Sequence, residues 1–192
     1  MMTDRCYSFL VIFVIISATC SLADGTVLSS TVPFTLSRNK TIVSHGDVFE
    51  LGLFKPDSSS RDGNRWYLGI WFKKIPTRTY VWVANRDKPL SIPVGTIRVL
   101  KSNLVLFDQS DTVVWSTNVT GEDGRSPLVA KLLDNGNFVL GYSNASEYLW
   151  QSFDFPTDTL IPGMKLGWER RTGRYSFLRS WKDITDPSTG DF

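Results

Sequence analysis

The stretch VVWSTN, residues 113–118, decides the fold because related stretches lie on both sides of it. It centres on Trp115, and the flanking copies are YVWVANR around Trp82 and YLWQSF around Trp150. The three tryptophans are separated by 33 and then 35 residues, and each is followed three residues later by Asn or Phe. Self-similarity at a fixed period is typical of repeat architectures, so the spacing predicts three units of about 34 residues.

A second shared feature lies ahead of two of these tryptophans. NLVL (103–106) and NFVL (137–140) begin 12 and 13 residues before Trp115 and Trp150. Each unit therefore has room for about three strands and one tryptophan. A sheet that small cannot bury its inner face alone, so we expect three sheets packed around a pseudo-threefold axis, where the three indoles meet.

The remaining pattern predicts an all-β chain. No sustained helical period occurs after residue 24, and short β-branched or aromatic runs alternate with Gly, Asn, Asp, Ser and Pro clusters. An immunoglobulin-like sandwich or a Greek-key barrel would lack the threefold tryptophan register. The predicted strands span residues 48–54, 66–72, 80–84, 96–100, 104–107, 113–116, 130–133, 138–142 and 148–152.

The first residues read as a secretory signal peptide. An unbroken apolar run at 9–16 follows Arg5, and small residues lead up to Ala23. The run fits an h-region of roughly 7 to 15 residues and is too short to span a bilayer. Cleavage after residue 23 or after residue 20 removes Cys6 and Cys20, the only cysteines, so the rest of the chain relies on its apolar core.

Charge and sequons agree with an extracellular protein. The net charge of +2 gives no electrostatic reason to expect a nucleic-acid partner. Three Asn-x-Ser/Thr sequons begin at Asn39, Asn118 and Asn144, beside turn-type residues from which a glycan could project. We expect at least two of them to carry N-glycans.

The pattern changes after residue 157. Residues 158–163 read as a loop, MKLGWERRTGRYSFLRSW as a hairpin that turns at Thr172-Gly173, and DPSTG as a turn. We therefore expect a signal peptide over 1–23, a threefold β domain over 24–157, and over 158–192 the incomplete beginning of a second β-rich region.

Six stretches together resemble the ectodomain of plant S-locus glycoproteins and of S-domain, or G-type lectin, receptor-like kinases. They are DVFELGLF, RWYLGIWFKKIPTRTYVWVANRDKPL, VVWSTN, LLDNGNFVL, LWQSFDFPTDTLIPGMKLG and SWKDITDPSTGDF. The resemblance runs from about residue 25 to the last residue. It implies a bulb-type, mannose-binding-like lectin domain, which is a threefold β-prism of three four-stranded sheets, followed by the start of an S-locus glycoprotein region.

The resemblance also implies a setting for the protein. Full-length relatives continue into cysteine-rich modules and, in the receptor kinases, into a membrane span and a Ser/Thr kinase. This chain has no Gly-rich phosphate loop and no HRD or DFG, so it contains no kinase motif. In the S-locus branch the resemblance implies recognition of pollen and self-incompatibility, with a small cysteine-rich pollen peptide as ligand and receptor dimerisation. In the wider receptor-kinase group it implies defence or developmental signalling equally. The expected location is extracellular, or the cell surface if a span follows.

Bulb-type lectins bind mannose through Gln-x-Asp-x-Asn-x-Val-x-Tyr, and two degenerate copies of this frame are present. The frame needs a carboxylate and amides for ring hydroxyls, but only its central Asn and Val survive in both copies. The first unit shows no recognisable copy. The copy in the second unit falls on Val99, Lys101, Asn103, Val105 and Phe107. The copy in the third unit falls on Leu133, Asn135, Asn137, Val139 and Gly141.

We therefore interpret the surviving residues as structural. A monosaccharide bound at millimolar affinity gains only about 4 kcal/mol, and losing two or three hydrogen bonds of about 1 kcal/mol each removes most of it. Val105 and Val139 should pack, and Asn103 and Asn137 should hold turn or strand-edge backbone.

Three functions follow as hypotheses. The first is a recognition module that binds a protein ligand, with specificity in the loops at 58–64 and 122–127. The alternative is a lectin that reads mannose-type glycans. A hydrolase using Asp154 and Asp158 is the third, although a turn and a cap explain both acids more simply. The lone His45 reads as a turn residue, and no ligand set for zinc and no calcium loop is evident, so we expect neither metal nor cofactor.

Overall fold

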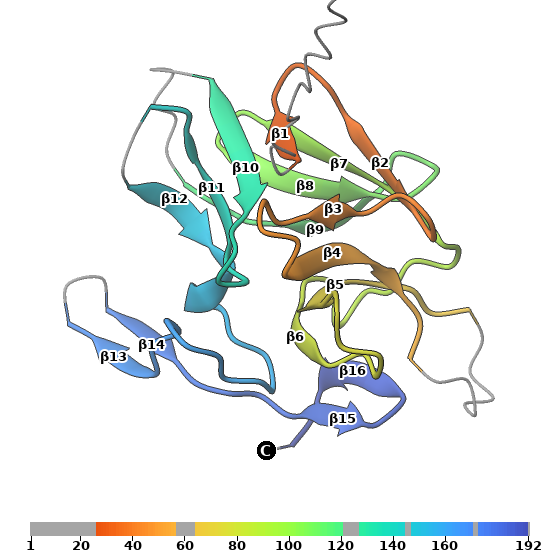
Figure 1. Cartoon of the computed structure of the whole chain (residues 1–192), viewed down its shortest axis with the longest axis vertical. Coiled ribbons are helices and arrows are strands. Elements are labelled where there is room, and N and C mark those ends of the chain that lie inside the picture. Colours follow the sequence, from red (N-terminus) through yellow and green to blue (C-terminus); the bar gives the residue numbers. More distant parts are fainter. Residues whose placement is uncertain (1–25, 57–63, 121–126, 145–146, 171–172, 192) are drawn as a thin grey trace, which may run out of the picture.

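The protein forms three four-stranded antiparallel sheets, shown in Figure 1. The structure is a computed structural model that describes residues 26–56, 64–120, 127–144, 147–170 and 173–191. The predicted signal peptide and most of the two predicted specificity loops lie outside these ranges.

One sheet has the order β3 (Ile42–Val43), β4 (Phe49–Phe54), β5 (Tyr67–Phe72), β6 (Tyr80–Val83). The second is β2 (Phe34–Ser37), β7 (Val94–Leu100), β8 (Asn103–Phe107), β9 (Val113–Ser116). The third is β1 (Val27–Ser29), β10 (Leu128–Leu132), β11 (Phe138–Tyr142), β12 (Tyr148–Gln151).

All nine predicted strands are present, with ends that differ by a few residues. The sequence pattern missed the fourth strand of each sheet. These three strands come from one N-terminal segment, in which β1 pairs with β10, β2 with β7 and β3 with β4. They are only 2 to 4 residues long, too short to show a clear alternation, and long-range pairing rather than local pattern makes them strands.

The pseudo-threefold repeat is preserved residue by residue in the strand pairing. In each sheet the strand next to the tryptophan strand (β5, β8 or β11) places an apolar residue opposite the unit's tryptophan. The register shifts directly after that residue in all three sheets. Such a bulge bends a strand and increases its local right-handed twist. The three pairs are Ile70 with Trp82, Leu106 with Trp115, and Leu140 with Trp150.

The three indoles meet, as the spacing predicts. The ring centroids of Trp82, Trp115 and Trp150 lie 5.7, 5.8 and 5.6 Å apart, with interplanar angles of 66–77°. These are edge-to-face contacts, which place the positive edge of one ring against the negative face of the next. One side chain from each sheet thus joins all three sheets at the axis, within a core that includes the fully buried Leu36, Leu51 and Leu104.

A threefold polar contact supplements the indoles. A backbone N–H near the start of β5, β8 and β11 donates to the side-chain oxygen of a residue that follows the unit's tryptophan by two or three positions. Leu68 N donates to Asn85 Oδ1 at 2.7 Å, Leu104 N to Thr117 Oγ1 at 3.1 Å, and Phe138 N to Ser152 Oγ at 2.9 Å. Because these groups are buried, each side chain satisfies a donor that would otherwise destabilise the sheet.

Two hairpins follow the three sheets. β13 (Gly167–Glu169) and β14 (Arg174–Ser176) form the predicted one, with Gly173 in the left-handed region at φ 68°. The prediction that DPSTG forms a turn was wrong, because β16 (Asp186–Thr189) pairs with β15 (Trp181–Asp183). In Figure 1 β15 and β16 lie next to β6, whereas β13 and β14 stand away from the three sheets.

The second hairpin is fastened to the first sheet. Trp181 lies 5.8 Å from Tyr80 and 6.2 Å from Phe54, between ring centroids. The buried guanidinium of Arg86 donates to the carbonyls of Arg179, Ser180, Pro187 and Ser188. Burial lowers the pKa of Arg86 from its ordinary value, and the four carbonyl acceptors replace the water that the guanidinium loses.

Within the described ranges there is no helix of the length and apolar character that crossing a membrane requires.

Candidate recognition site

The first candidate site is the degenerate mannose frame on the second sheet. Asn103 does not present its amide to solvent ligands. Its Oδ1 accepts from Val119 N at 2.7 Å and from Thr117 Oγ1 at 2.9 Å, and its Nδ2 donates to Val119 O at 3.1 Å. Lys101 occupies a turn at φ 51°, and Val105 and Phe107 are buried. The retained asparagine therefore holds the loop that follows β9.

The third sheet repeats this arrangement with a different network. Asn137 is buried, and its Oδ1 accepts from Ser152 Oγ and Phe153 N, both at 3.2 Å. Its Nδ2 donates to Gln151 Oε1 at 2.9 Å. Asn135, which replaces the frame's carboxylate, accepts from Asn137 N at 3.0 Å and so closes the turn.

The apolar position of the frame behaves similarly in both copies. Val139, like Val105, is a buried packing residue. That the surviving Asn and Val residues act only structurally stays a prediction.

The strand register locates the equivalent place in the first unit, which the sequence pattern missed. Gly69 and Trp71 align with the Val and Tyr positions of the frame, and Tyr67 aligns with its Asn. A Cβ on Gly69 would lie 2.6 Å from the Phe54 ring, so this face is already full. With Trp181 packed on the same cluster, the first unit is used for internal packing.

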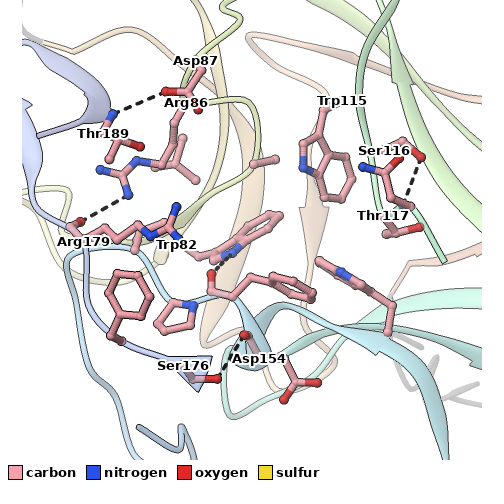
Figure 2. Close-up of a pocket in the computed structure, with 18 of the residues that line it drawn as sticks. Trp82, Arg86, Asp87, Trp115, Ser116, Thr117, Asp154, Ser176, Arg179 and Thr189 are labelled. Carbon is pink, nitrogen blue, oxygen red and sulfur yellow. Dashed lines mark hydrogen bonds between the residues drawn. The ribbon is translucent and has the colours of Figure 1, made fainter. Parts of the chain in front are cut away.

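The second candidate site is a cleft at the tryptophan end of the prism, shown in Figure 2. It encloses about 710 Å³ between the edge strands β6 and β9 and the segment from β12 through β14. In Figure 2 Trp115 and Ser116 form one wall, and Ser176 and Arg179 lie on the opposite side. Its volume falls within the range of about 300–1,000 Å³ that is usual for ligand sites.

Aromatic and polar groups alternate around the cleft. Trp82 Nε1 donates to Phe155 O at 3.0 Å, and Phe155 stacks on Trp150 with centroids 5.8 Å apart. Tyr175 and Phe177 remain 65% and 44% exposed at the rim, with the Arg179 guanidinium 4.6 Å from the Phe177 ring centroid on one face of that ring. Flat apolar rings beside hydrogen-bonding groups suit the alternating CH and hydroxyl surfaces of a sugar.

The two carboxylates considered for hydrolysis have structural partners. Asp154 pairs with Arg174 and accepts from Gln151 Nε2 at 3.1 Å, and Asp158 accepts from the hydroxyls of Thr157 and Thr159. His45 is exposed in a turn. No group of three His, Cys, Asp or Glu residues that could hold a metal occurs among the residues with described positions.

The predicted glycosylation positions are all at the surface. Asn39, Asn118 and Asn144 are exposed, and each lies outside the strands. Asn118 has a left-handed backbone at φ 52°, and it lines the cleft. Their occupancy by glycans stays a prediction.

Sequence reasoning did not single out Arg86, Trp181 or the threefold set Asn85, Thr117 and Ser152. The set had a detectable signal, because each member follows its tryptophan by two or three residues. Arg86 and Trp181 had none, because their partners lie about 100 residues away in the chain.

The fold and the degenerate frames together define the class of threefold β-prism lectins of the bulb type. Comparison with known families agrees: residues 79–182 match the family described as D-mannose binding lectin. As this match covers more than half of the chain, the protein belongs to that family. The match extends beyond residue 157, and the division at 24–157 and 158–192 stays a prediction.

Curated relatives are S-domain proteins of plants. The chain is 59% identical to receptor-like serine/threonine-protein kinase SD1-8 of Arabidopsis thaliana, over 97% of the chain and 22% of that protein. It is 54% identical to S-locus-specific glycoprotein S6 of Brassica oleracea, over 96% of the chain and 42% of that protein. The chain thus spans between a fifth and somewhat over two fifths of the length of these relatives.

Among solved structures, a monomeric monocot mannose-binding lectin from Gastrodia elata is similar. The identity is 15% and the TM-score 0.46, over 66% of this chain and 94% of that one.

Proposed function

We propose that this protein is an extracellular recognition module of the S-domain class that binds a protein ligand. In the S-locus branch of the family the ligand would be a small cysteine-rich pollen peptide, and recognition would serve self-incompatibility and involve receptor dimerisation. Secretion rests on the predicted signal peptide at 1–23. We assign the chain a binding role, because it matches the lectin family and covers only 22% of the kinase relative from Arabidopsis thaliana.

The observation that carries this proposal is that the side-chain amides of Asn103 and Asn137 form hydrogen bonds within the protein. Both amides are engaged with protein groups, so the two asparagines that survive from the frames are already hydrogen-bonded within the protein. Mannose binding at either place would have to break these contacts, at about 1–3 kcal/mol for each buried group left unpaired. That cost is comparable to the roughly 4 kcal/mol that a millimolar ligand provides.

Exposed apolar side chains support a polypeptide partner. Trp168 is 63% exposed and Ile184 is 87% exposed, one on each C-terminal hairpin. Trp168 lies opposite the exposed Tyr175 in the β13–β14 pairing, and adjoining exposed apolar side chains are typical of surfaces that contact another polypeptide.

The test is the binding of the fluorescently labelled protein to plant cell-surface preparations. We expect binding to disappear after protease treatment of the preparation and to survive treatment with α-mannosidase. In calorimetry, methyl mannoside at up to about 10 mM should give no saturable heat, in line with the affinity scale above. Binding that is lost with α-mannosidase, together with millimolar or tighter mannose affinity, would establish the mannose-binding lectin in its place.

A further inference from the structure

The cleft has a surface asparagine on its wall whose position is held firmly. Asn118 follows β9 and belongs to the sequon Asn118-Val119-Thr120. The residues on either side of it, Thr117 and Val119, both bond to the amide of Asn103. The backbone of Asn118 is left-handed at φ 52°, a conformation that Asn adopts more readily than most residues. The former sugar-frame residue Asn103 thus anchors the sequon at the edge of the cleft.

The cleft is suited to the first sugars of a glycan attached there. Trp115, Asn118, Tyr175 and Phe177 all line the cleft, and Tyr175 and Phe177 are 65% and 44% exposed. Trp115 Nε1 has no hydrogen-bond partner within the described part of the chain, unlike Trp82 Nε1, which donates to Phe155 O. An acetamido oxygen in the cleft would provide such a partner.

We propose that Asn118 carries an N-glycan and that its first N-acetylglucosamine units lie in this cleft, between Trp115 and the rings of Tyr175 and Phe177. The secretory glycosyltransferase forms the bond between Asn118 Nδ2 and C1 of the sugar. The lipid pyrophosphate leaves from C1, and Nδ2 loses one proton. The docking of the sugar involves no further covalent step.

Because the glycan is covalently attached, weak contacts are sufficient to keep its sugars in the cleft. Free monosaccharides bind protein surfaces with dissociation constants near 1 mM, equivalent to about 4 kcal/mol. A short flexible link gives an effective concentration of the order of millimolar, so a tethered sugar occupies such a site for a large part of the time. A free sugar at lower concentration would leave the same cleft empty.

The docked glycan would connect two parts of the protein. Asn118 belongs to the prism, whereas Tyr175 lies on the β13–β14 hairpin, whose Arg174 and Ser176 contact Asp154. Sugars between them would hold this hairpin against the prism and cover its aromatic rim. This role is independent of the ligand proposed above.

The experiment uses the full chain produced in a secretory host that adds oligomannose glycans. An endoglycosidase is applied under native conditions, and the rate of glycan release is followed at Asn118 and at Asn39. We expect release at Asn118 to be about twofold slower, because an effective concentration near the dissociation constant leaves the tethered sugar docked for about half of the time. The double variant Tyr175→Ala, Phe177→Ala should raise the Asn118 rate by that factor and leave the Asn39 rate unchanged.

Hydrogen exchange provides the second measurement. Amides of residues 174–177 should exchange severalfold faster in Asn118→Gln and in Thr120→Ala than in the glycoprotein. Thr120→Ser keeps the sequon and should behave as the parent, and Asn144→Gln removes a different sequon without effect. The proposal is overturned if Asn118 carries no glycan. It is equally overturned if the glycan is present, the double variant leaves its release rate unchanged, and Asn118→Gln leaves the exchange of amides 174–177 unchanged.

Discussion

Single asparagines show how a ligand-type residue becomes a structural one. Asn103 and Asn137 occupy equivalent positions in their sheets, yet they hold different neighbours through the same short amide. An amide has both donor and acceptor groups, so it can satisfy two or three backbone or hydroxyl groups at once. Each residue is therefore explained by the chain around it without reference to a sugar.

Asn137→Ala should lower the free energy of unfolding by about 2–4 kcal/mol. It leaves Ser152 Oγ, Phe153 N and Gln151 Oε1 without their present partner, and each buried unsatisfied group costs about 1–3 kcal/mol. Urea unfolding measures the change. The matched variant Asn135→Ala removes one bond from an exposed side chain and should cost under about 1 kcal/mol. Equal losses in the two variants would contradict the structural role of Asn137.

At the scale of elements, the β15–β16 hairpin shows how a distant segment completes a sheet face. It docks through the Trp181 ring, the Arg86 guanidinium and the ion pair between Arg65 and Asp186 at 3.1 Å. Burial alone would raise the pKa of Asp186, but hydrogen bonds from Ser188 and the charge of Arg65 outweigh it. The net result is a pKa below the ordinary value of about 3.8.

Docking of this hairpin should weaken in acid. Because the folded pKa of Asp186 is depressed, its contribution is fully present above the unfolded pKa and is lost as the pH falls through the folded value. The contribution should be under about 1 kcal/mol, because Arg65 is partly exposed. Near-UV circular dichroism of the Trp181 and Tyr80 rings between pH 2 and 6 should show a transition below about pH 4.

Two variants assign that transition. Asp186→Asn should lack it. Asp183 also has a lowered pKa, through hydrogen bonds from Thr185 within the hairpin turn, so Asp183→Asn should retain the transition. A transition that is unchanged in Asp186→Asn would show that another carboxylate controls the docking.

At the scale of the whole molecule, the three sheets share one core and one cluster of indoles. No sheet buries its inner face alone, and the N-terminal segment adds one strand to each of the three. Cooperative unfolding of the whole prism follows from this arrangement, because loss of any sheet exposes the other two.

Trp82→Ala should therefore destabilise all three sheets together, by about 3–5 kcal/mol. Trp82 is buried, contacts the other two indoles and donates to Phe155 O. Hydrogen exchange should show faster exchange in β8 and β11 as well as in β5. Trp168→Ala, at an exposed position, should change stability by less than about 0.5 kcal/mol. Faster exchange confined to the first sheet would contradict a shared core.

The amino-acid sequence by itself determined the repeat, the all-β class, nine strands of the prism and the meeting of Trp82, Trp115 and Trp150. These features depend on local alternation and on a fixed period, which are visible along one chain. The sequence also indicated that the sugar frames at Asn103 and Asn137 are degenerate, because the lost groups are read directly.

Only the tertiary structure decided the three N-terminal strands, the docking of β15–β16 and the cleft beside Asn118. Each depends on contacts between residues far apart in the chain, such as Arg86 with Pro187 or Trp181 with Tyr80. Strands of 2 to 4 residues and a single arginine have no local pattern of their own. Their conformations and partners follow from which surfaces the folded prism leaves to be covered.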